Sequence, residues 1–364
     1  MAMTSSFRIA VLPGDGIGVE VTAAGVAALE RLAATTPGLT FDFRPLPGGA
    51  RHYRDTGTAF DDSSMRALEN CDAILFGAMG LPDVRYPNGT EIAPQLDIRE
   101  HLSLYAGVRP TRVMPGMPTV LADPRASGID FVILREQTEG FFHSRGKADI
   151  DAEGANDHSR LTRRGCERVF EFAFRLARRR RSQGRPGKVT CVDKSNVLTS
   201  MAYMRGVFDE CAKRHPDIAA ERCYVDAMAL YLVQKPWEYD VIVTENLFGD
   251  ILSDLAGGLA GGMGLAASGD VGDTHAMFQP AHGSAPDIAG RGIANPTAML
   301  LSCAMLLDWL GERHGHAPAA KAAQRLQSAV HAAYGEGRVK PREFGGSDGT
   351  AEITRAVLDG IATA

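Results

Sequence analysis

A chain of 364 residues, 45% of them hydrophobic, can bury a large core, so two domains or one large two-lobed unit are expected. The formal net charge of -5 argues against a nucleic acid as the main partner, and no apolar run reaches the roughly 18 residues that a membrane span needs. The chain start lacks a charged and then apolar leader, and six scattered cysteines without a C-x-x-C pair are typical of reduced core thiols. We therefore expect a cytoplasmic protein that binds neither nucleic acid nor membrane.

A strand at 8–12 and a helix at 19–33 are predicted on either side of a glycine turn, Gly14-Asp15-Gly16-Ile17-Gly18. A strand, a glycine turn and a helix N-terminus together suggest a phosphate cradle. The dinucleotide fingerprint G-x-G-x-x-G is not matched, because the third glycine comes one residue early and Val19 takes its place. We therefore disfavour an ordinary Rossmann site. Strands at 39–44 and 73–76 and a helix at 63–69 continue the alternation, which indicates an α/β core with parallel pairing.

Three arginines follow. Residues 95–110 have apolar positions at helical spacing, with Arg99 on the helix and Arg109 just after it, and Arg135 comes at the end of an apolar strand. Guanidinium groups bind carboxylates through paired hydrogen bonds, so this arrangement suits a substrate with two carboxylates, although arginine is too common for the pattern to decide alone. The polar segment 140–160 is too long for a simple turn and predicts an arm or lid.

Residues 163–181 predict a helix, and the run Arg178 to Arg181 fits its C-terminal end, where cations offset the macrodipole, better than a nucleic-acid patch. A strand at 188–193 leads into Lys194, which is either an exposed cap residue or a functional amine. The remaining elements of this part are a helix at 199–214, a strand at 222–225 and a helix that Asp226 opens.

Residues 240–254 predict a buried strand that passes into a helix, with Asn246 as its cap. Asp250 and Asp254 lie four residues apart, a spacing that stacks two carboxylates on one helix face. They would repel each other at neutral pH unless a cation lay between them, and oxygen ligands suit a hard divalent ion. The alternative is a pair of solvated acids on a helix surface.

A glycine-rich segment at 257–269 leads to a loop at 282–296 that is dense in small and polar residues and precedes an apolar helix at 297–310. Small residues let a flat ligand approach the backbone closely. We therefore expect a cofactor loop here.

These segments resemble, in order and along nearly the whole chain, the β-decarboxylating dehydrogenases of 3-isopropylmalate, isocitrate, homoisocitrate, tartrate and D-malate. The matching motifs are the turn at 14–18, the three arginines, D-K-S-N-V-L at 193–198, Y-V-D-A-M at 224–228, N-L-F-G-D-I-L-S-D at 246–254 and the loop at 282–296. The resemblance implies an isopropylmalate dehydrogenase-like fold of two α/β lobes around one large mixed sheet, not a Rossmann fold. The first lobe, residues 1–104 and 261–364, would bind the cofactor. The second, residues 105–260, would carry the dimer interface, the metal and substrate residues and the arm at about 140–160.

The resemblance also implies a homodimer with shared active sites. Asp250, Asp254 and Asp226 of the partner subunit would bind Mg²⁺ or Mn²⁺, and Lys194 of the partner subunit would help remove the substrate's hydroxyl proton. The arginines would clamp the carboxylate that leaves. The implied reaction is NAD-dependent oxidation and decarboxylation of a (2R)-malate-type 2-hydroxy acid. The implied substrate contacts further include Gln95, Asn196 and Val197, and the implied cofactor contacts are Ile17, His282, Gly283, Ser284, Ala285, Pro286, Asp287, Ile288 and Asn295.

The cofactor should be NAD rather than NADP. Asp287 can accept hydrogen bonds from a ribose 2′-hydroxyl and would repel a 2′-phosphate, whereas family members that resemble NADP users carry Lys-Tyr where Asp287 and Ile288 stand.

Some positions depart from the family pattern. Relatives usually have Glu where Ile92 stands and Leu where Gln95 stands, so tartrate or D-malate remains an alternative substrate. Phe142 takes the place of the family's tyrosine acid, which leaves a catalytically weak regulatory homologue as a second alternative. Gln279 stands where relatives usually show Glu. An ordinary Rossmann 2-hydroxyacid dehydrogenase and a metal-independent binding protein are the remaining alternatives.

Overall fold

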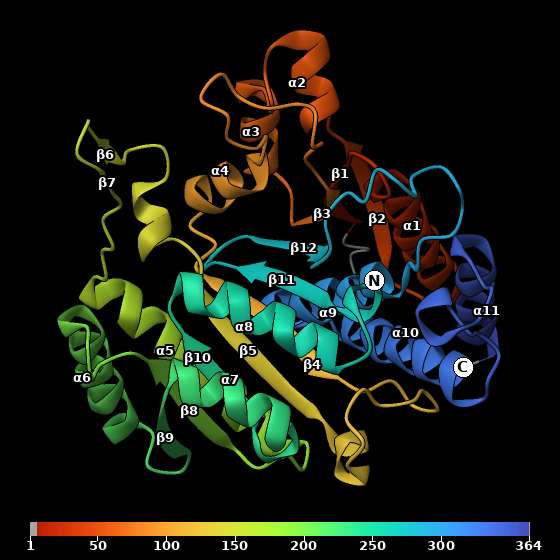
Figure 1. The fold of residues 1–364 in the computed structure, drawn as a ribbon. Helices are drawn as coiled ribbons and strands as arrows, with labels where there is room; N and C mark the ends of the chain where they lie inside the picture. Colours follow the sequence, from red (N-terminus) through yellow and green to blue (C-terminus); the bar gives the residue numbers. More distant parts are fainter. Residues whose placement is uncertain (1–5, 364) are drawn as a thin grey trace.

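Ten strands form a single mixed sheet in the computed structural model, which describes residues 6–363 (Figure 1). Residues 1–5, where no leader is expected, and residue 364 lie outside the described part. In spatial order the strands are β2 (Thr40–Pro45), β1 (Ser6–Gly14), β3 (Ala73–Ala78), β12 (Ala276–Pro280), β11 (Ala267–Val271), β4 (Ala106–Arg112), β5 (Asp130–Glu136), β10 (Val241–Thr244), β8 (Lys188–Asp193) and β9 (Ala219–Tyr224). The large mixed sheet confirms the expected fold class.

The two ends of the sheet are parallel and its centre is antiparallel. β2, β1, β3 and β12 pair in parallel, as do β5, β10, β8 and β9, whereas β12, β11, β4 and β5 pair antiparallel. Strands covered on both faces need apolar side chains at every position, and β3 and β10 are buried throughout. The predicted parallel pairing is therefore confirmed for both ends.

Helices cover both faces of the sheet. The α-helices of the described part are α1 (Gly18–Thr35), α2 (Ala50–Thr56), α3 (Asp62–Leu68), α4 (Pro94–His101), α5 (Arg163–Ser182), α6 (Thr199–Arg214), α7 (Val225–Gln234), α8 (Asn246–Leu259), α9 (Thr297–His314), α10 (Ala317–Gly335) and α11 (Thr350–Thr363). The period of two along β10 divides its side chains between the faces. Val241 and Val243 join the core cluster that contains α5 and α6, whereas Ile242 joins Leu232 of α7 and Leu252 of α8.

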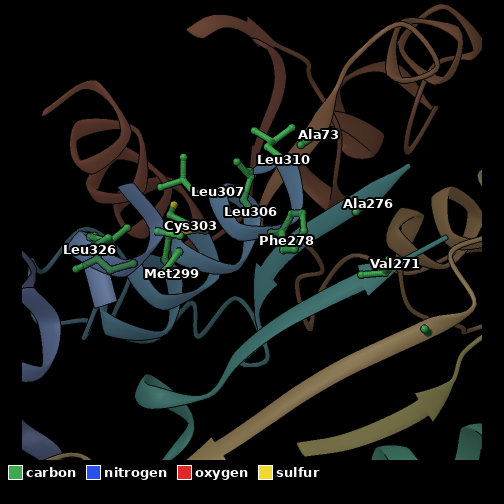
Figure 2. Close-up of a cluster of buried hydrophobic side chains, with 14 of the residues drawn as sticks. Ala73, Val271, Ala276, Phe278, Met299, Cys303, Leu306, Leu307, Leu310 and Leu326 are labelled. Carbon is green, nitrogen blue, oxygen red and sulfur yellow. The ribbon is translucent and has the colours of Figure 1, made fainter. Parts of the chain in front are cut away.

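Both chain ends contribute to one packed unit. α1 lies against α9 and α11, and α10 lies against α9 and α11 (Figure 1). Figure 2 shows the buried cluster between this helix layer and the sheet, which contains Met299, Leu306 and Leu310 of α9 and Phe278 of β12. All six cysteines are free thiols and five are buried, so the prediction of reduced core residues is confirmed for all but the half-buried Cys223. None of the helices in residues 6–363 is long and apolar enough to cross a membrane.

The segment predicted as an arm forms a short hairpin of β6 (Asp149–Ile150) and β7 (Ala155–Asn156), which projects from the body of the molecule (Figure 1). Ile150 at its tip is 76% exposed. An exposed β-branched side chain on an isolated two-residue ladder has no core of its own to pack against. The hairpin thus has the form expected of an arm.

Two predictions about local structure are wrong. Arg109 does not follow a helix but lies inside β4, because the helix ends at His101 and the apolar residues after it belong to a strand. α8 is capped by Glu245 rather than Asn246, since the Glu245 carboxylate accepts hydrogen bonds from the backbone N–H groups of Leu247 and Phe248. The short helix α2, the hairpin of β11 and β12, and the C-terminal helices α10 and α11 were not predicted.

Candidate functional site

A cleft of about 240 Å³ lies where α4 and α8 approach the sheet. Its lining brings together residues that are far apart in the sequence. The predicted site residues among them are Gln95, Arg99, Arg109, Arg135, Asp250, Asp254, His282 and Gly283, and Phe142 and Gln279 also line the cleft. The three arginines and the two helical aspartates therefore share one concave site.

Arg99 and Arg109 are buried and joined by Asp270, a fully buried carboxylate on β11. Arg99 donates from Nε to Asp270 Oδ2 at 2.8 Å, and Arg109 donates from Nη1 to Asp270 Oδ1 at 3.0 Å. Burial alone would raise the pKa of Asp270, but the positive charges of Arg99 and Arg109 hold it at about 2. Asp270 is thus a permanent anion behind the two guanidinium groups.

Arg135 connects the arginines to the acidic face of α8. It donates from Nε to Asn246 Oδ1 at 2.8 Å and from Nη1 to Asp250. Burial lowers the pKa of Arg135 to about 10 although Asp250 favours its charged form. Burial also raises the pKa of Asp254, and the negative charge of Asp250 adds to this shift. The pair has the spacing and mutual repulsion predicted for a site that gains from a cation.

Lys194 and Asp226 lie together but outside this cleft in the described part of the chain. Lys194 Nζ donates to Asp226 Oδ1 at 2.7 Å, and this hydrogen bond lowers the pKa of Asp226. Asn196 and Val197 follow Lys194 in the turn before α6 and are exposed, as is Asp226, whereas Lys194 itself is half-buried. The structure therefore separates the candidate residues into a cleft set and a second set around Lys194 that one protomer alone does not bring together.

The residues fit a divalent metal in part. Asp250 and Asp254 supply hard oxygen donors at the edge of the cleft, in keeping with the chemistry of Mg²⁺ or Mn²⁺. Within residues 6–363, however, no group of three His, Cys, Asp or Glu side chains is arranged to hold a metal ion. A metal held by two carboxylates of one chain would need its other ligands from substrate, water or a second protomer.

The glycine turn lies against the predicted cofactor loop. Ile17 donates its backbone N–H to the Ser284 carbonyl at 2.8 Å, and a Cβ added at Gly16, whose φ is +56°, would lie 1.9 Å from that oxygen. Asp15 is fully buried and accepts backbone hydrogen bonds from Ala50, Arg51 and Gly80. The N–H groups of the turn itself are also in use, since Asp15, Ile17 and Gly18 donate to the carbonyls of Ala78, Ser284 and Asp15, so these donors are not free for a phosphate.

The loop itself carries one unsatisfied polar atom and several exposed residues. His282 has a buried Nε2 atom without a hydrogen-bond partner in the described structure, and burial lowers the pKa of this imidazole. An orphaned polar atom beside the cleft is what a bound adenine or ribose would satisfy. Gly283, Pro286 and Asp287 are exposed.

The other loop residues have structural partners. Ser284 is buried and donates to the Gly80 carbonyl, Ala285 has a φ of +37°, and Ile288 donates its N–H back to the Ala285 carbonyl. Asn295 is buried, accepts from the Thr297 N–H and donates to Tyr334 Oη at 3.3 Å. Its amide therefore supports the start of α9.

Sequence reasoning missed Asp270, Gln137 and Ser268. Asp270 is the partner of Arg99 and Arg109, Gln137 bridges Arg109 and Asp270, and Ser268 accepts from Arg109. A charged residue in an otherwise small and apolar stretch was the available signal at Asp270, because buried charges are rarely left unpaired.

The sequence matches the family model described as isocitrate/isopropylmalate dehydrogenase over residues 8–357. It is 41% identical over 352 residues to a 3-isopropylmalate/3-methylmalate dehydrogenase of Methanocaldococcus jannaschii, covering 96% of this chain and 97% of the relative. It is also 41% identical over 348 residues to a 3-isopropylmalate dehydrogenase of Rhodococcus opacus, covering 93% of this chain and 98% of the relative.

Solved structures of this family have the same fold as this chain. The isocitrate dehydrogenase of Methylococcus capsulatus superposes with a TM-score of 0.84 at 34% identity, covering 98% of this chain and 99% of that chain. A β-decarboxylating dehydrogenase of Thermococcus kodakarensis, in its apo form, superposes with a TM-score of 0.77 at 36% identity, covering 98% and 96%. Sequence and fold therefore agree along nearly the whole chain.

Proposed function

Because the chain belongs to the isocitrate/isopropylmalate dehydrogenase family of β-decarboxylating dehydrogenases, we propose that it oxidises and decarboxylates a (2R)-malate-type 2-hydroxy acid in the manner of a 3-isopropylmalate dehydrogenase. The observation that carries this proposal is the cleft in which three arginines face two carboxylates. Guanidinium groups bind one end of a dicarboxylate, and a divalent ion bound by Asp250 and Asp254 would polarise the hydroxyl at the other end.

The chain's own residues divide the remaining work. Arg99, Arg109 and Arg135 bind and orient the carboxylate that leaves. Lys194 of the partner subunit would accept the hydroxyl proton, and bound NAD would supply the hydride acceptor. The three arginines are buried, which strengthens their charge interactions with a bound acid.

We propose NAD as the hydride acceptor. Asp287 is exposed on the cofactor loop, where it can accept from the ribose 2′-hydroxyl and repels a 2′-phosphate. His282 offers its buried Nε2 atom, which has no other hydrogen-bond partner in the described structure, to the adenine of the cofactor. The backbone hydrogen bond from Ile17 to Ser284 fixes the base of the loop.

We propose that residues 1–104 and 261–364 form a cofactor-binding lobe and residues 105–260 form a second lobe. The strand order supports this division, because the first five strands in the sheet, β2, β1, β3, β12 and β11, fall in the first set and the other five fall in the second. The cleft lies at the seam between the two sets, so a small motion of one lobe against the other would open or close it.

We also propose a homodimer that shares its active sites. α7 and α8 lie side by side on one face of the sheet and expose Leu230, Val233 and Ile251, which are 53%, 47% and 62% exposed (Figure 1). Adjacent exposed aliphatic side chains favour burial against a second copy. Asp226, which accepts a hydrogen bond from Lys194, lies in the first turn of the same helix α7. Dimerisation through this face would therefore bring Lys194 and Asp226 towards the partner's cleft.

Mixing two inactive variants tests the shared site. A Lys194→Ala protomer and an Asp250→Asn protomer each lack one active-site residue. Their heterodimer has one complete active site and one site that lacks both residues. We expect restored activity of about a quarter of the wild-type value after random subunit exchange. The measurement is NADH formation before and after exchange, with heterodimer content verified by native mass spectrometry.

A matched mixture supplies the control. Lys194→Ala and Asp226→Asn remove residues that the same protomer contributes, so no heterodimer of these two has a complete site, and no activity should return. Equal recovery in both mixtures, or none in either despite verified exchange, would contradict the shared site.

The substrate's substituent is addressed by Gln95, whose amide lines the cleft and whose Oε1 atom is buried without a partner in the described structure. An isopropyl group against this amide would leave it unsatisfied, at a cost of about 1–3 kcal/mol. A substrate hydroxyl, or a small substituent that leaves room for a water molecule, would satisfy the amide. This observation favours the second candidate activity, that of a tartrate or D-malate dehydrogenase.

A panel of (2R)-malate derivatives assayed with NAD and Mn²⁺ tests both candidates. We expect D-malate or tartrate to match or exceed 3-isopropylmalate in kcat/KM, and Gln95→Leu to shift the ratio towards 3-isopropylmalate by about tenfold, the equivalent of 1.4 kcal/mol. If wild type prefers 3-isopropylmalate by orders of magnitude, the argument from the Gln95 amide is wrong. Turnover of none of these acids would contradict the proposed function itself.

A further inference from the structure

A four-donor network surrounds the Asp270 carboxylate behind the cleft. Oδ1 accepts from Arg109 Nη1 at 3.0 Å and from Gln137 Nε2 at 2.7 Å. Oδ2 accepts from Arg99 Nε at 2.8 Å and from Gln279 Nε2 at 2.8 Å. A carboxylate has about four acceptor positions, so each oxygen of Asp270 is filled by one guanidinium and one amide.

This network fixes the orientation of both arginines. Arg99 is held through Nε, which leaves its two terminal nitrogens for a ligand in the cleft that it lines. Arg109 is held more fully, since Nη1 also donates to Ser268 and Nη2 donates to Gln137 Oε1 at 3.0 Å. Gln137 therefore ties Arg109 to Asp270 from both ends of its amide.

The same geometry explains why an amide stands at position 279. Gln279 Nε2 is a donor facing Asp270 Oδ2, and both residues are at least nine-tenths buried. A carboxylate at 279 would turn this hydrogen bond into the contact of two buried acceptors with like charge. One of the two acids would then have to take up a proton, which would weaken its hold on the arginines.

We propose that Asp270 is the positioning residue of the substrate clamp: it holds Arg99 and Arg109 in the orientation that receives the leaving carboxylate, and the neutral Gln279 is its required partner. The proposal rests on the proposed function for the identity of the ligand, a dicarboxylate. Asp270 itself touches no substrate and acts through the two arginines.

Asp270→Asn tests the proposal, because it keeps the side chain's volume but gives a donor to a site with four donors. We expect the dissociation constant of D-malate, measured by calorimetry with Mn²⁺ and without NAD, to rise by about 10- to 100-fold. KM should rise in parallel while kcat at saturation changes by less than about threefold. Asp308→Asn is the matched control, because Asp308 also pairs with an arginine, Arg179, but lies outside the cleft.

Relocating the acid separates positioning from mere structural support. Gln279→Glu alone should weaken D-malate binding because it places two acids together. The double variant Asp270→Asn/Gln279→Glu restores one acid facing one amide, and we expect it to regain at least about tenfold in affinity over Asp270→Asn. Such rescue requires the charge and the hydrogen bond rather than the shape of residue 270.

The outcomes distinguish this proposal from the proposed function. Tight D-malate binding by wild type without turnover of any malate would overturn the proposed function. The D-malate affinities of the variants would then still decide the role of Asp270. Unchanged D-malate affinity in Asp270→Asn, or losses that add in the double variant, would overturn the positioning role. A lower thermal unfolding midpoint with unchanged affinity would show that Asp270 only stabilises the fold.

Discussion

Asp250→Asn is expected to lower kcat/KM by about 10³-fold or more, the equivalent of about 4 kcal/mol of lost transition-state stabilisation. The substitution removes a charge from the face that Asp250 shares with Asp254 at the cleft and hardly changes the volume. Binding of Mn²⁺, followed by calorimetry in the absence of substrate, should weaken together with activity. The thermal unfolding midpoint without metal should stay close to that of wild type, because Asp250 is half exposed.

Asp250 also pairs with Arg135, so the loss of a metal ligand has to be separated from the loss of an arginine partner. Asn246→Ala is the matched control, since it removes the other partner of Arg135 and leaves both carboxylates in place. We expect this variant to bind Mn²⁺ normally and to lose affinity for the acid. Wild-type activity that resists chelators, or an Asp250→Asn variant with unchanged Mn²⁺ affinity, would refute the metal site.

Local sequence patterns were enough to predict the strands and helices whose own residues show a clear hydrophobic pattern. β3, β10, α1, α5, α6 and α9 were predicted within a few residues, because continuous apolar runs and helical spacing mark buried strands and amphipathic helices. β11 gave no such signal. Its sequence, Ala-Ser-Gly-Asp-Val, has low strand propensity, and it is a strand because β4 and β12 pair with it on either side.

The candidate site residues also divide into those that local sequence patterns predict and those that they do not. Arg99, Arg135, Asp250 and Asp254 were found because residue type and position along an element are local information. The link between Arg99 and Asp270 spans 171 residues and that between Gln137 and Asp270 spans 133, so no spacing rule reaches them. α2 was missed for a related reason. Its first N–H groups are held by the Asp15 carboxylate, a contact across 35 residues that replaces a local cap.

Phe142 occupies the cleft, where the family pattern expects a tyrosine acid. Its ring lines the cleft, and the Arg135 guanidinium carbon lies 5.0 Å from the ring centroid. The ring therefore has the place of a catalytic group without its hydroxyl. A general acid contributes about 10² to 10⁴ in rate, so protonation of the enolate left after decarboxylation should be slow unless water or another side chain supplies the proton.

Phe142→Tyr should therefore speed carbon dioxide release selectively. In wild type we expect NADH to form faster than carbon dioxide, with some keto acid released intact, and in the variant we expect the two products to form together. Phe141→Tyr is the matched control, because Phe141 is the adjacent ring and is exposed. It adds the same hydroxyl outside the lining of the cleft and should leave the product ratio unchanged. The measurement is simultaneous recording of NADH and carbon dioxide on the preferred acid. Fast formation of both in wild type, unchanged by Phe142→Tyr, would show that another group donates the proton and that the phenylalanine does not limit decarboxylation.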